Sequence, residues 1–370
     1  MNFEPRNLFI TGGAGFIGSN FVHHWLANTR EGRVVVFDAL TYAGNMDSLS
    51  DIAANPRYLF VKGDICDEAN VRGLLEQHQI DTLVHFAAES HVDRSILGPD
   101  DFIRTNVIGT HSLLKAAKTL WIDKQTVPAH RFHHVSTDEV YGSLGPHDAP
   151  FHEDSPYAPN SPYSASKAAS DHLVRAYHET YGVNTTVTNC SNNYGPYHFP
   201  EKLIPLTIVN ILLGKPLPVY GDGLQVRDWL HVEDHCAAIK LALSKGEPGA
   251  VYNVGGNSET TNIHIVQTLC ELVDERLKAH PEYRVSFPAS PIYNGTKAVQ
   301  LISHVRDRPG HDRRYAINYS KAAKSLGYAP TRDLLTGLGS TVDWYLRQVK
   351  WWQDLLGREY AAWVRKNYDG

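Results

Sequence analysis

The stretch Thr11-Gly12-Gly13-Ala14-Gly15-Phe16-Ile17-Gly18 joins a predicted strand, Leu8–Thr11, to a predicted helix, Phe16–Asn28. It contains both the GxGxxG and the GxxGxxG spacing. Glycines at these positions allow a tight turn, close approach of the backbone to a pyrophosphate, and close packing of helix on strand. The helix N-terminus adds free amides and a partial positive charge. The stretch therefore predicts a dinucleotide-binding βαβ unit.

The next predicted strand, Val34–Phe37, ends in Asp38, twenty residues after Gly18. A carboxylate at this place accepts hydrogen bonds from both ribose hydroxyls and repels a 2′-phosphate, so NAD is favoured over NADP. Asp64 and Ile65 follow the third strand, and residues 86–90 end the fourth. Ligands gather at such carboxyl ends of parallel strands.

Short β-branched and aromatic runs alternate with helix-length amphipathic segments through the first half of the chain, which is typical of a parallel sheet built from βαβ units. Strands are predicted at Leu8–Thr11, Val34–Asp38, Tyr58–Lys62, Thr82–Ala87, Phe132–Ser136 and Thr185–Cys190. Helices are predicted at Phe16–Asn28, Glu68–His78, Phe102–Leu120 and Pro162–Tyr181. The predicted fold class is α/β, a doubly wound parallel Rossmann sheet with a smaller, mixed C-terminal substrate lobe.

After about residue 190 this alternation gives way to shorter elements separated by Pro- and Gly-rich turns. One further buried strand is predicted at Val251–Val254, which would bring the chain back to the sheet. We therefore expect residues 1–190 to form an NAD-binding Rossmann domain with a returning segment at about 228–258. Residues 191–227 and 259–370 would form the second lobe.

Composition narrows the class of protein. With 42% hydrophobic and 20% charged residues and no apolar run near the roughly 18 residues that a bilayer requires, no membrane span is expected. A net charge of −5 gives no support for binding nucleic acid or an anionic membrane surface. Four scattered cysteines without a CxxC pair, and no visible export signal, indicate a cytoplasmic protein without a disulfide framework.

Two motifs predict acid–base chemistry. Tyr163 and Lys167 stand four residues apart on a predicted helix and so share a face. A nearby ammonium, helped by the positive nicotinamide ring, would lower the pKa of the phenol, which could then take a proton from a hydroxyl as hydride leaves the same carbon. Upstream, Thr137 could bond the reacting oxygen. Asp138 and Glu139 add two carboxyl groups, which suit the acid and the base that elimination of water requires.

Taken with these motifs, further stretches resemble the dTDP-glucose 4,6-dehydratases of the extended short-chain dehydrogenase/reductase family from about residue 7 to about 350. They are Thr41–Asn45, Ala88–Asp93, Ser191–Pro196, Arg227–Trp229 and Asp307–Asp312. The Thr-Asp-Glu triplet is the sharpest match, because related epimerases and decarboxylases usually carry other residues there.

The resemblance implies that dTDP-glucose is dehydrated to dTDP-4-keto-6-deoxyglucose with NAD that is retained and regenerated. Tyr163 would deprotonate the C4 hydroxyl as hydride passes to NAD. Glu139 would remove the C5 proton while Asp138 protonates the departing C6 hydroxyl, and hydride would return to C6. The expected catalytic residues are thus Thr137, Asp138, Glu139, Tyr163 and Lys167.

The resemblance also implies two sets of binding residues and a homodimer formed through Phe102–Leu120 and Pro162–Tyr181. Arg227 would suit the pyrophosphate, because a guanidinium binds phosphate oxygens in pairs. The cofactor set is Gly12, Gly15, Phe16, Ile17, Gly18, Asp38, Thr41, Gly44, Asp64, Ile65, Ala87, Ala88, Ser90, Thr105, Tyr163, Lys167 and Asn193. The nucleotide-sugar set is Ser90, Thr137, Asn192, Lys202, Leu203, Pro218, Tyr220, Arg227, Asn262, Asp307, Arg308 and His311.

Other readings stay open at this point. A UDP- or GDP-hexose 4,6-dehydratase is the nearest alternative, followed by a 4-epimerase or decarboxylase, and then a catalytically silent NAD-binding regulator. No metal is expected, since His231 and His235 do not form HExxH. The aromatic residues Trp351, Trp352, Tyr360 and Trp363 near the C-terminus are expected to pack in a core or an interface.

Overall fold

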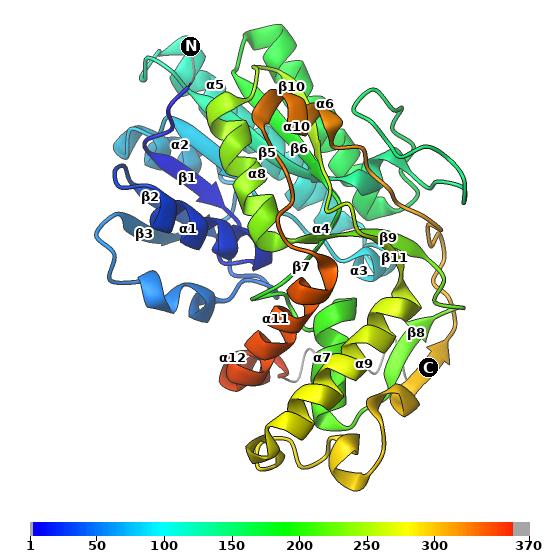
Figure 1. The fold of residues 1–370 in the computed structure, drawn as a ribbon. Coiled ribbons are helices and arrows are strands. Elements are labelled where there is room, and N and C mark those ends of the chain that lie inside the picture. The colour runs from blue at the N-terminus through cyan, green and yellow to red at the C-terminus, as the bar shows by residue number, and fades with distance from the viewer. Residues whose placement is uncertain (1–2, 358–370) are drawn as a thin grey trace.

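The computed structural model, which describes residues 3–357, shows an α/β lobe that carries the N-terminus and a smaller lobe beside it (Figure 1). The larger lobe is built on a seven-stranded sheet in the order β10-β6-β5-β4-β1-β2-β3, and every pair is parallel. Its strands are β1 Leu8–Thr11, β2 Val34–Asp38, β3 Tyr58–Lys62, β4 Thr82–His85, β5 Arg131–Thr137, β6 Thr185–Cys190 and β10 Ala250–Val254. The predicted doubly wound sheet is confirmed.

Helices cover both faces of this sheet because its strands are apolar on both sides. On β1, Leu8 and Ile10 pack with α1 and α8, whereas Phe9 packs on the opposite face. The first layer consists of α1 Phe16–Asn28 and α8 Val232–Lys245, and the second of α2 Glu68–Gln77, α5 Thr110–Lys118 and α6 Pro162–Tyr181. Buried parallel strands of this kind need a cover on each face.

Several element boundaries differ from the prediction, some by one residue: α2 ends at Gln77, not His78, and β10 begins at Ala250, not Val251. The strand expected at Thr82–Ala87 ends at His85, because its neighbour β1 ends at Thr11 where the glycine turn begins. Strand β5 is one residue longer at each end than expected. The helix expected at Phe102–Leu120 consists of α4 Asp100–Phe102, a π-helical turn at Ile103–Gly109, α5, and a second π-helical turn at Thr119–Asp123.

The smaller lobe has short strands and a separate core. A mixed three-stranded sheet has the order β11-β9-β7, and β12 pairs with β8. These strands are β7 Asn192–Tyr194, β8 Leu217–Tyr220, β9 Val226–His231, β11 Glu259–Thr261 and β12 Ile302–Val305. Helices α7 Leu203–Leu213, α9 Asn262–Ala279, α11 Leu334–Arg347 and α12 Val349–Leu355 enclose the core. Trp351 and Trp352 are buried in it as expected, while Tyr360 and Trp363 lie outside the described residues.

The predicted return of the chain to the large sheet is confirmed, since α8 packs on α1 and β10 pairs with β6. Helix α3 Val92–Leu97 lies near the junction of the lobes (Figure 1). Helix α10 Ser320–Leu326 packs against β10. The division into 1–190 with 228–258, against 191–227 with 259–370, stays a prediction. Within residues 3–357, no helix combines the length and apolarity that crossing a bilayer demands.

Candidate active site

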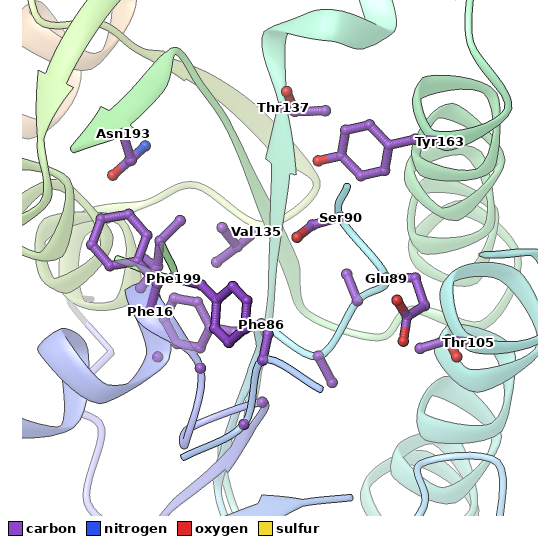
Figure 2. A pocket seen from close by; sticks show the side chains of 18 of the residues that line it. Phe16, Phe86, Glu89, Ser90, Thr105, Val135, Thr137, Tyr163, Asn193 and Phe199 are labelled. Carbon is purple, nitrogen blue, oxygen red and sulfur yellow. The ribbon is translucent and has the colours of Figure 1, made fainter. Parts of the chain in front are cut away.

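A cavity of about 400 Å³ opens where the carboxyl ends of the parallel strands meet the smaller lobe (Figure 2). Every residue predicted to bind the cofactor lines it, and so do the five residues predicted to be catalytic. Five of the predicted nucleotide-sugar residues line it as well: Ser90, Thr137, Asn192, Lys202 and Leu203. The fold thus brings together motifs that lie far apart in the sequence.

The glycine turn leaves no room for side chains. Gly12 has φ +70°, and a Cβ atom on it would lie 2.5 Å from the backbone nitrogen of Ala87. A Cβ on Gly18 would lie 2.2 Å from the carbonyl oxygen of Gly12. Helix α1 begins after Gly15 without a side-chain cap, so its first amides remain available to an anion. This cradle fits a pyrophosphate.

Asp38 fixes the turn against the end of β2. One carboxylate oxygen accepts from the backbone nitrogen of Ala14 at 2.9 Å, and the other accepts from that of Leu40 at 2.8 Å. Because each carboxylate oxygen has further acceptor capacity, the group can still bind hydroxyls from the cavity. Burial raises the pKa of Asp38. The Asp38 carboxylate as an acceptor for ribose hydroxyls, and the cradle for the pyrophosphate, together fit NAD.

Tyr163 enters the cavity from the first turn of α6. That turn is fixed by Pro162 and by a capping box between Ser161 and Ser164. Figure 2 shows the phenol reaching toward Thr137 at the end of β5, and the Thr137 hydroxyl is a hydrogen-bond partner of Tyr163. Thr137 also accepts from the backbone nitrogen of Glu139 at 3.3 Å, which starts a 3₁₀ turn over Asp138–Tyr141.

The acidity of Tyr163 differs from the sequence-based expectation. Burial, and then the negative charge of Glu139, raise its pKa well above the ordinary value, while the hydrogen bond from Thr137 opposes them. Lys167 does not produce the expected lowering of the phenol pKa, because its ammonium faces elsewhere. Its Nζ donates to the carbonyl of Val135 at 2.9 Å and lies 3.4 Å from His134 Nε2. No charge or hydrogen bond from the protein therefore fully offsets the rise that burial causes in the pKa of Tyr163.

Asp138 and Glu139 occupy different electrostatic surroundings. Asp138 is 1% exposed, and burial followed by the charge of Glu139 raises its pKa well above the ordinary value. Burial also raises the pKa of Glu139, but the cations Arg308, Arg227 and Lys202 oppose this shift. Asp138 is therefore the better proton donor and Glu139 the better base.

Seven predicted nucleotide-sugar residues lie outside the cavity lining, although they gather in the smaller lobe beside it: Pro218, Tyr220, Arg227, Asn262, Asp307, Arg308 and His311. Tyr220 and Arg308 both bond Asp93, at 3.1 and 3.2 Å. Arg227 is 4% exposed and donates to the carbonyl of Asp312 at 2.9 Å. The Arg227 guanidinium, which was expected to face a pyrophosphate, thus donates to backbone carbonyl oxygens.

Some lining residues escaped the sequence reasoning. His198 and Glu201 line the cavity, and no motif or spacing marks them; Glu89 lines it too and lies within the stretch 86–90, but it was not named as a site residue. Glu201 accepts from both Nε and Nη2 of Arg94, at 3.2 and 3.1 Å, which ties α3 to the start of the smaller lobe. Asp171, beneath Lys167, could have been found, since it continues the i, i+4 spacing of Tyr163 and Lys167 along α6.

A glycine turn with Asp38, joined to a tyrosine and a lysine one helical turn apart, defines a nucleotide-dependent enzyme of the short-chain dehydrogenase/reductase type. The family model described as GDP-mannose 4,6 dehydratase matches residues 9–341. A dTDP-glucose 4,6-dehydratase from Xanthomonas campestris is 56% identical over 353 residues, covering 95% of this chain and 96% of the relative. One from Salmonella typhimurium is 50% identical over 374 residues, covering 98% and 99%.

Solved structures of related enzymes have a similar fold. The crystal structure of a dTDP-glucose 4,6-dehydratase from Streptomyces venezuelae with NAD and TYD bound has a TM-score of 0.83 at 44% identity, covering 94% of this chain and 99% of that one. A UDP-glucose 4-epimerase from Thermotoga maritima has a TM-score of 0.78 at 27% identity, covering 93% and 99%. The chain belongs to the family of the dTDP-glucose 4,6-dehydratases.

Proposed function

We propose that the protein is an NAD-dependent dTDP-glucose 4,6-dehydratase, a hydro-lyase that forms dTDP-4-keto-6-deoxyglucose. The observation that carries this proposal is the pair of carboxyl groups beside Tyr163, of which Asp138 is buried and Glu139 is half-buried. An epimerase needs the tyrosine, whereas elimination of water also needs an acid and a base. Both are in place, so a silent regulator is disfavoured.

NAD, when bound, accepts a hydride from C4 of the hexose, returns it to C6, and brings a positive ring that favours the phenolate. Its pyrophosphate would be held by the amides at the start of α1, and its adenosine ribose by Asp38. The remaining cofactor residues named from the sequence line the same cavity. Lys167 would hold the second ribose.

Tyr163, as the phenolate that the positive nicotinamide ring would favour, receives the C4 hydroxyl proton on its oxygen, and Thr137 orients that oxygen through the hydrogen bond between them. The resulting C4 ketone makes the C5 proton acidic. Glu139 removes this proton, and Asp138 donates its own to the departing C6 oxygen. The raised pKa of Asp138 keeps the donor protonated for this step. When hydride has been returned to C6, Glu139 gives a proton back to C5.

Over one turnover, one proton passes from the C4 hydroxyl to the leaving water. Tyr163 gains this proton while Asp138 loses one, so a proton must travel between them before the next cycle. The Thr137 hydroxyl bonds Tyr163 and lies 3.4 Å from Asp138 Oδ1. It therefore offers a short route for resetting the site.

The smaller lobe would bind the nucleotide. Lys202, whose Nζ donates to the carbonyl of Ser90 at 3.0 Å, stands at the cavity. Together with Arg227 and Arg308, it would neutralise the diphosphate after those side chains turn toward the ligand. The names of the relatives favour dTDP as the nucleotide. UDP- and GDP-hexoses remain the alternatives, and the family model's description names the latter.

The dimer and the compartment are part of the proposal. Large apolar side chains are exposed on and near the segment Phe102–Leu120: Leu97 at 54%, Ile103 at 48% and Ile108 at 53%. A second copy packed there would bury them. Cys66, Cys190, Cys236 and Cys270 are all free thiols, which suits a reducing cytoplasm.

To test the function, purified protein is incubated separately with dTDP-glucose, UDP-glucose and GDP-mannose, and the products are identified by mass spectrometry and NMR. We expect loss of one water and a 4-keto-6-deoxy product, fastest with dTDP-glucose. A product of unchanged mass from dTDP-glucose would indicate epimerisation, and loss of carbon dioxide from a uronic acid would indicate decarboxylation.

A further inference from the structure

Beneath Tyr163, the buried side chains of Lys167, His134 and Asp171 lie in a row, and the proposed function assigns no role to His134 and Asp171. Lys167 Nζ lies 3.4 Å from His134 Nε2, and the same nitrogen lies 3.2 Å from Asp171 Oδ1. The three residues are 4%, 0% and 5% exposed. Asp171 follows Lys167 by four residues on α6, so both point to the same side of the helix.

Asp171 is held firmly from the other side. Its Oδ2 accepts from the Ser136 hydroxyl and from the Tyr157 hydroxyl, each at 2.9 Å. Tyr157 is itself fixed, because its hydroxyl accepts from Asn189 Nδ2 at 3.0 Å. Oδ1 has no hydrogen bond of its own within the described part of the chain and faces His134.

His134 Nε2 stands between a carboxylate and an ammonium. A neutral imidazole nitrogen either donates or accepts, so it bonds one of these groups at a time. Burial lowers the pKa of His134 well below the ordinary value, so the ring is neutral. It can therefore accept from the Lys167 ammonium, or donate to Asp171 when the lysine is uncharged.

A buried ammonium needs a nearby negative charge, because its desolvation is costly. The titratable groups that face Lys167 are Tyr163 and Asp171 from α6, His134 from β5, His85 from β4 and Cys190 from β6. Burial lowers the pKa of His85 and raises those of Tyr163 and Cys190, which leaves these groups neutral near pH 7. Burial raises the pKa of Asp171 to about 6, so this carboxyl is still ionised.

We propose that Asp171, by its charge beside His134, is the positioning residue that keeps Lys167 charged and holds its ammonium in place at the cavity. The inference rests on the proposed function, in which Lys167 would hold the second ribose of NAD while C4 is oxidised. It assigns a role to a carboxylate that does not itself line the cavity but accepts a hydrogen bond from Ser136, which does.

The sign of the pH effect follows from the charges. Burial lowers the pKa of Lys167 to about 8, and Asp171 opposes that shift. Removing the charge of Asp171 lowers the pKa of Lys167 further, so the charged lysine disappears at a lower pH. The alkaline fall in the rate of C4 oxidation then moves toward neutral pH.

The experiment isolates oxidation from elimination. Glu139→Gln is used as the background, because it should oxidise C4 without removing the C5 proton. Reduction of bound NAD by dTDP-glucose is followed by stopped-flow absorbance over a range of pH, with and without Asp171→Asn. We expect Asp171→Asn to move the alkaline limb down by about one pH unit, equal to a roughly tenfold slower oxidation above the limb.

Two further variants separate charge from packing. Tyr157→Phe removes a hydrogen bond to the same carboxylate but leaves its charge, so the limb should stay in place. His134→Phe keeps a ring of similar size without the nitrogen and should shift the limb as Asp171→Asn does, which provides a second test should Asp171→Asn fail to fold.

An unshifted limb in folded Asp171→Asn or His134→Phe overturns the inference, as does an equal shift in Tyr157→Phe. A background variant that never reduces NAD counts against the proposed function, and the inference falls with it. Far-UV circular dichroism and thermal unfolding confirm that each compared variant is folded.

Discussion

At the scale of single residues, the division of labour between Asp138 and Glu139 comes from their surroundings. They are adjacent in sequence and both are pushed toward the protonated form by burial. Three cations oppose the rise in the pKa of Glu139, whereas at Asp138 the charges of Glu139 and Asp228 add to the rise and Arg227 opposes it. The sequence could show that two carboxyl groups were present. It could not show which one keeps its proton, because that depends on Arg227 and Arg308 from a distant part of the chain.

Replacing Tyr163 by Phe tests the first proton transfer. Without a phenol oxygen, the C4 hydroxyl has no base, so NAD reduction by substrate should fall by at least about 100-fold, the usual contribution of a general base. Stopped-flow absorbance of the reduced nicotinamide measures it. Nicotinamide reduction at the parent rate in folded Tyr163→Phe would refute the role.

Replacing Asp138 by Asn tests the acid. The amide cannot donate a proton to the departing C6 oxygen, so oxidation should proceed while loss of water slows by about 100-fold or more. Rapid-quench sampling, with bound reduced nicotinamide followed in parallel, distinguishes the two steps. If Asp138→Asn turns over fully at the parent rate, another group must be the acid.

The pH dependence of elimination follows from the same pair. The step should accelerate as Glu139 ionises, above a pKa raised from its ordinary value, and slow as Asp138 loses its proton, at a pKa raised further. A bell-shaped profile is expected for the rate of water loss in a single turnover. A rate that keeps rising with pH would show that no protonated carboxyl is needed.

At the scale of elements, the sequence predicted the parallel strands and α6 closely, because their patterns are local. Strand apolarity and the Pro162 and Gly182 signals mark those elements without knowledge of the fold. The end of β4 and the π-helical turns around α5 were missed. The former depends on where its partner β1 ends, and the latter on how the helix packs, so neither leaves a local pattern.

Gly18→Ala tests the fit of α1 on the glycine turn. The added Cβ would lie 2.2 Å from the Gly12 carbonyl and displace the helix from the phosphate cradle. We expect a lower melting temperature and less NAD in the purified protein, read from absorbance after denaturation. Gly73→Ala is the control, since nothing lies within 4 Å of its added Cβ in α2 and it should be neutral or stabilising.

An unchanged NAD content together with an unchanged melting temperature in Gly18→Ala would mean that α1 tolerates a side chain there. The cradle would then not depend on close packing.

At the scale of the whole molecule, the site exists only because two lobes meet. The cofactor-binding part of the site lies at the carboxyl ends of the strands of one sheet, and the sequence predicted almost all of its residues. The nucleotide half draws on β8, β9 and the segment after β12, whose relative positions no spacing encodes. Its residues were therefore named by resemblance, and seven of them lie beside the cavity and not in its lining.

The dimer belongs to this scale too. Ile103→Glu places a charge on an exposed apolar position within the expected interface and should convert a dimer to a monomer. Sedimentation velocity of parent and variant measures the change. Leu335→Glu, at a 60% exposed position on α11, is the control and should remain dimeric. A parent protein that sediments as a monomer would contradict the proposed dimer.

The central claim is that oxidation at C4 serves to acidify C5 so that water can leave from C6. Its most direct test is conversion of dTDP-glucose in heavy water with catalytic enzyme and no added NAD, followed by mass spectrometry and NMR of the product. We predict loss of one water, one deuterium at C5 and hydrogen transferred from C4 to C6. A product that keeps all the oxygen atoms of the substrate, or one without deuterium at C5, would contradict the account.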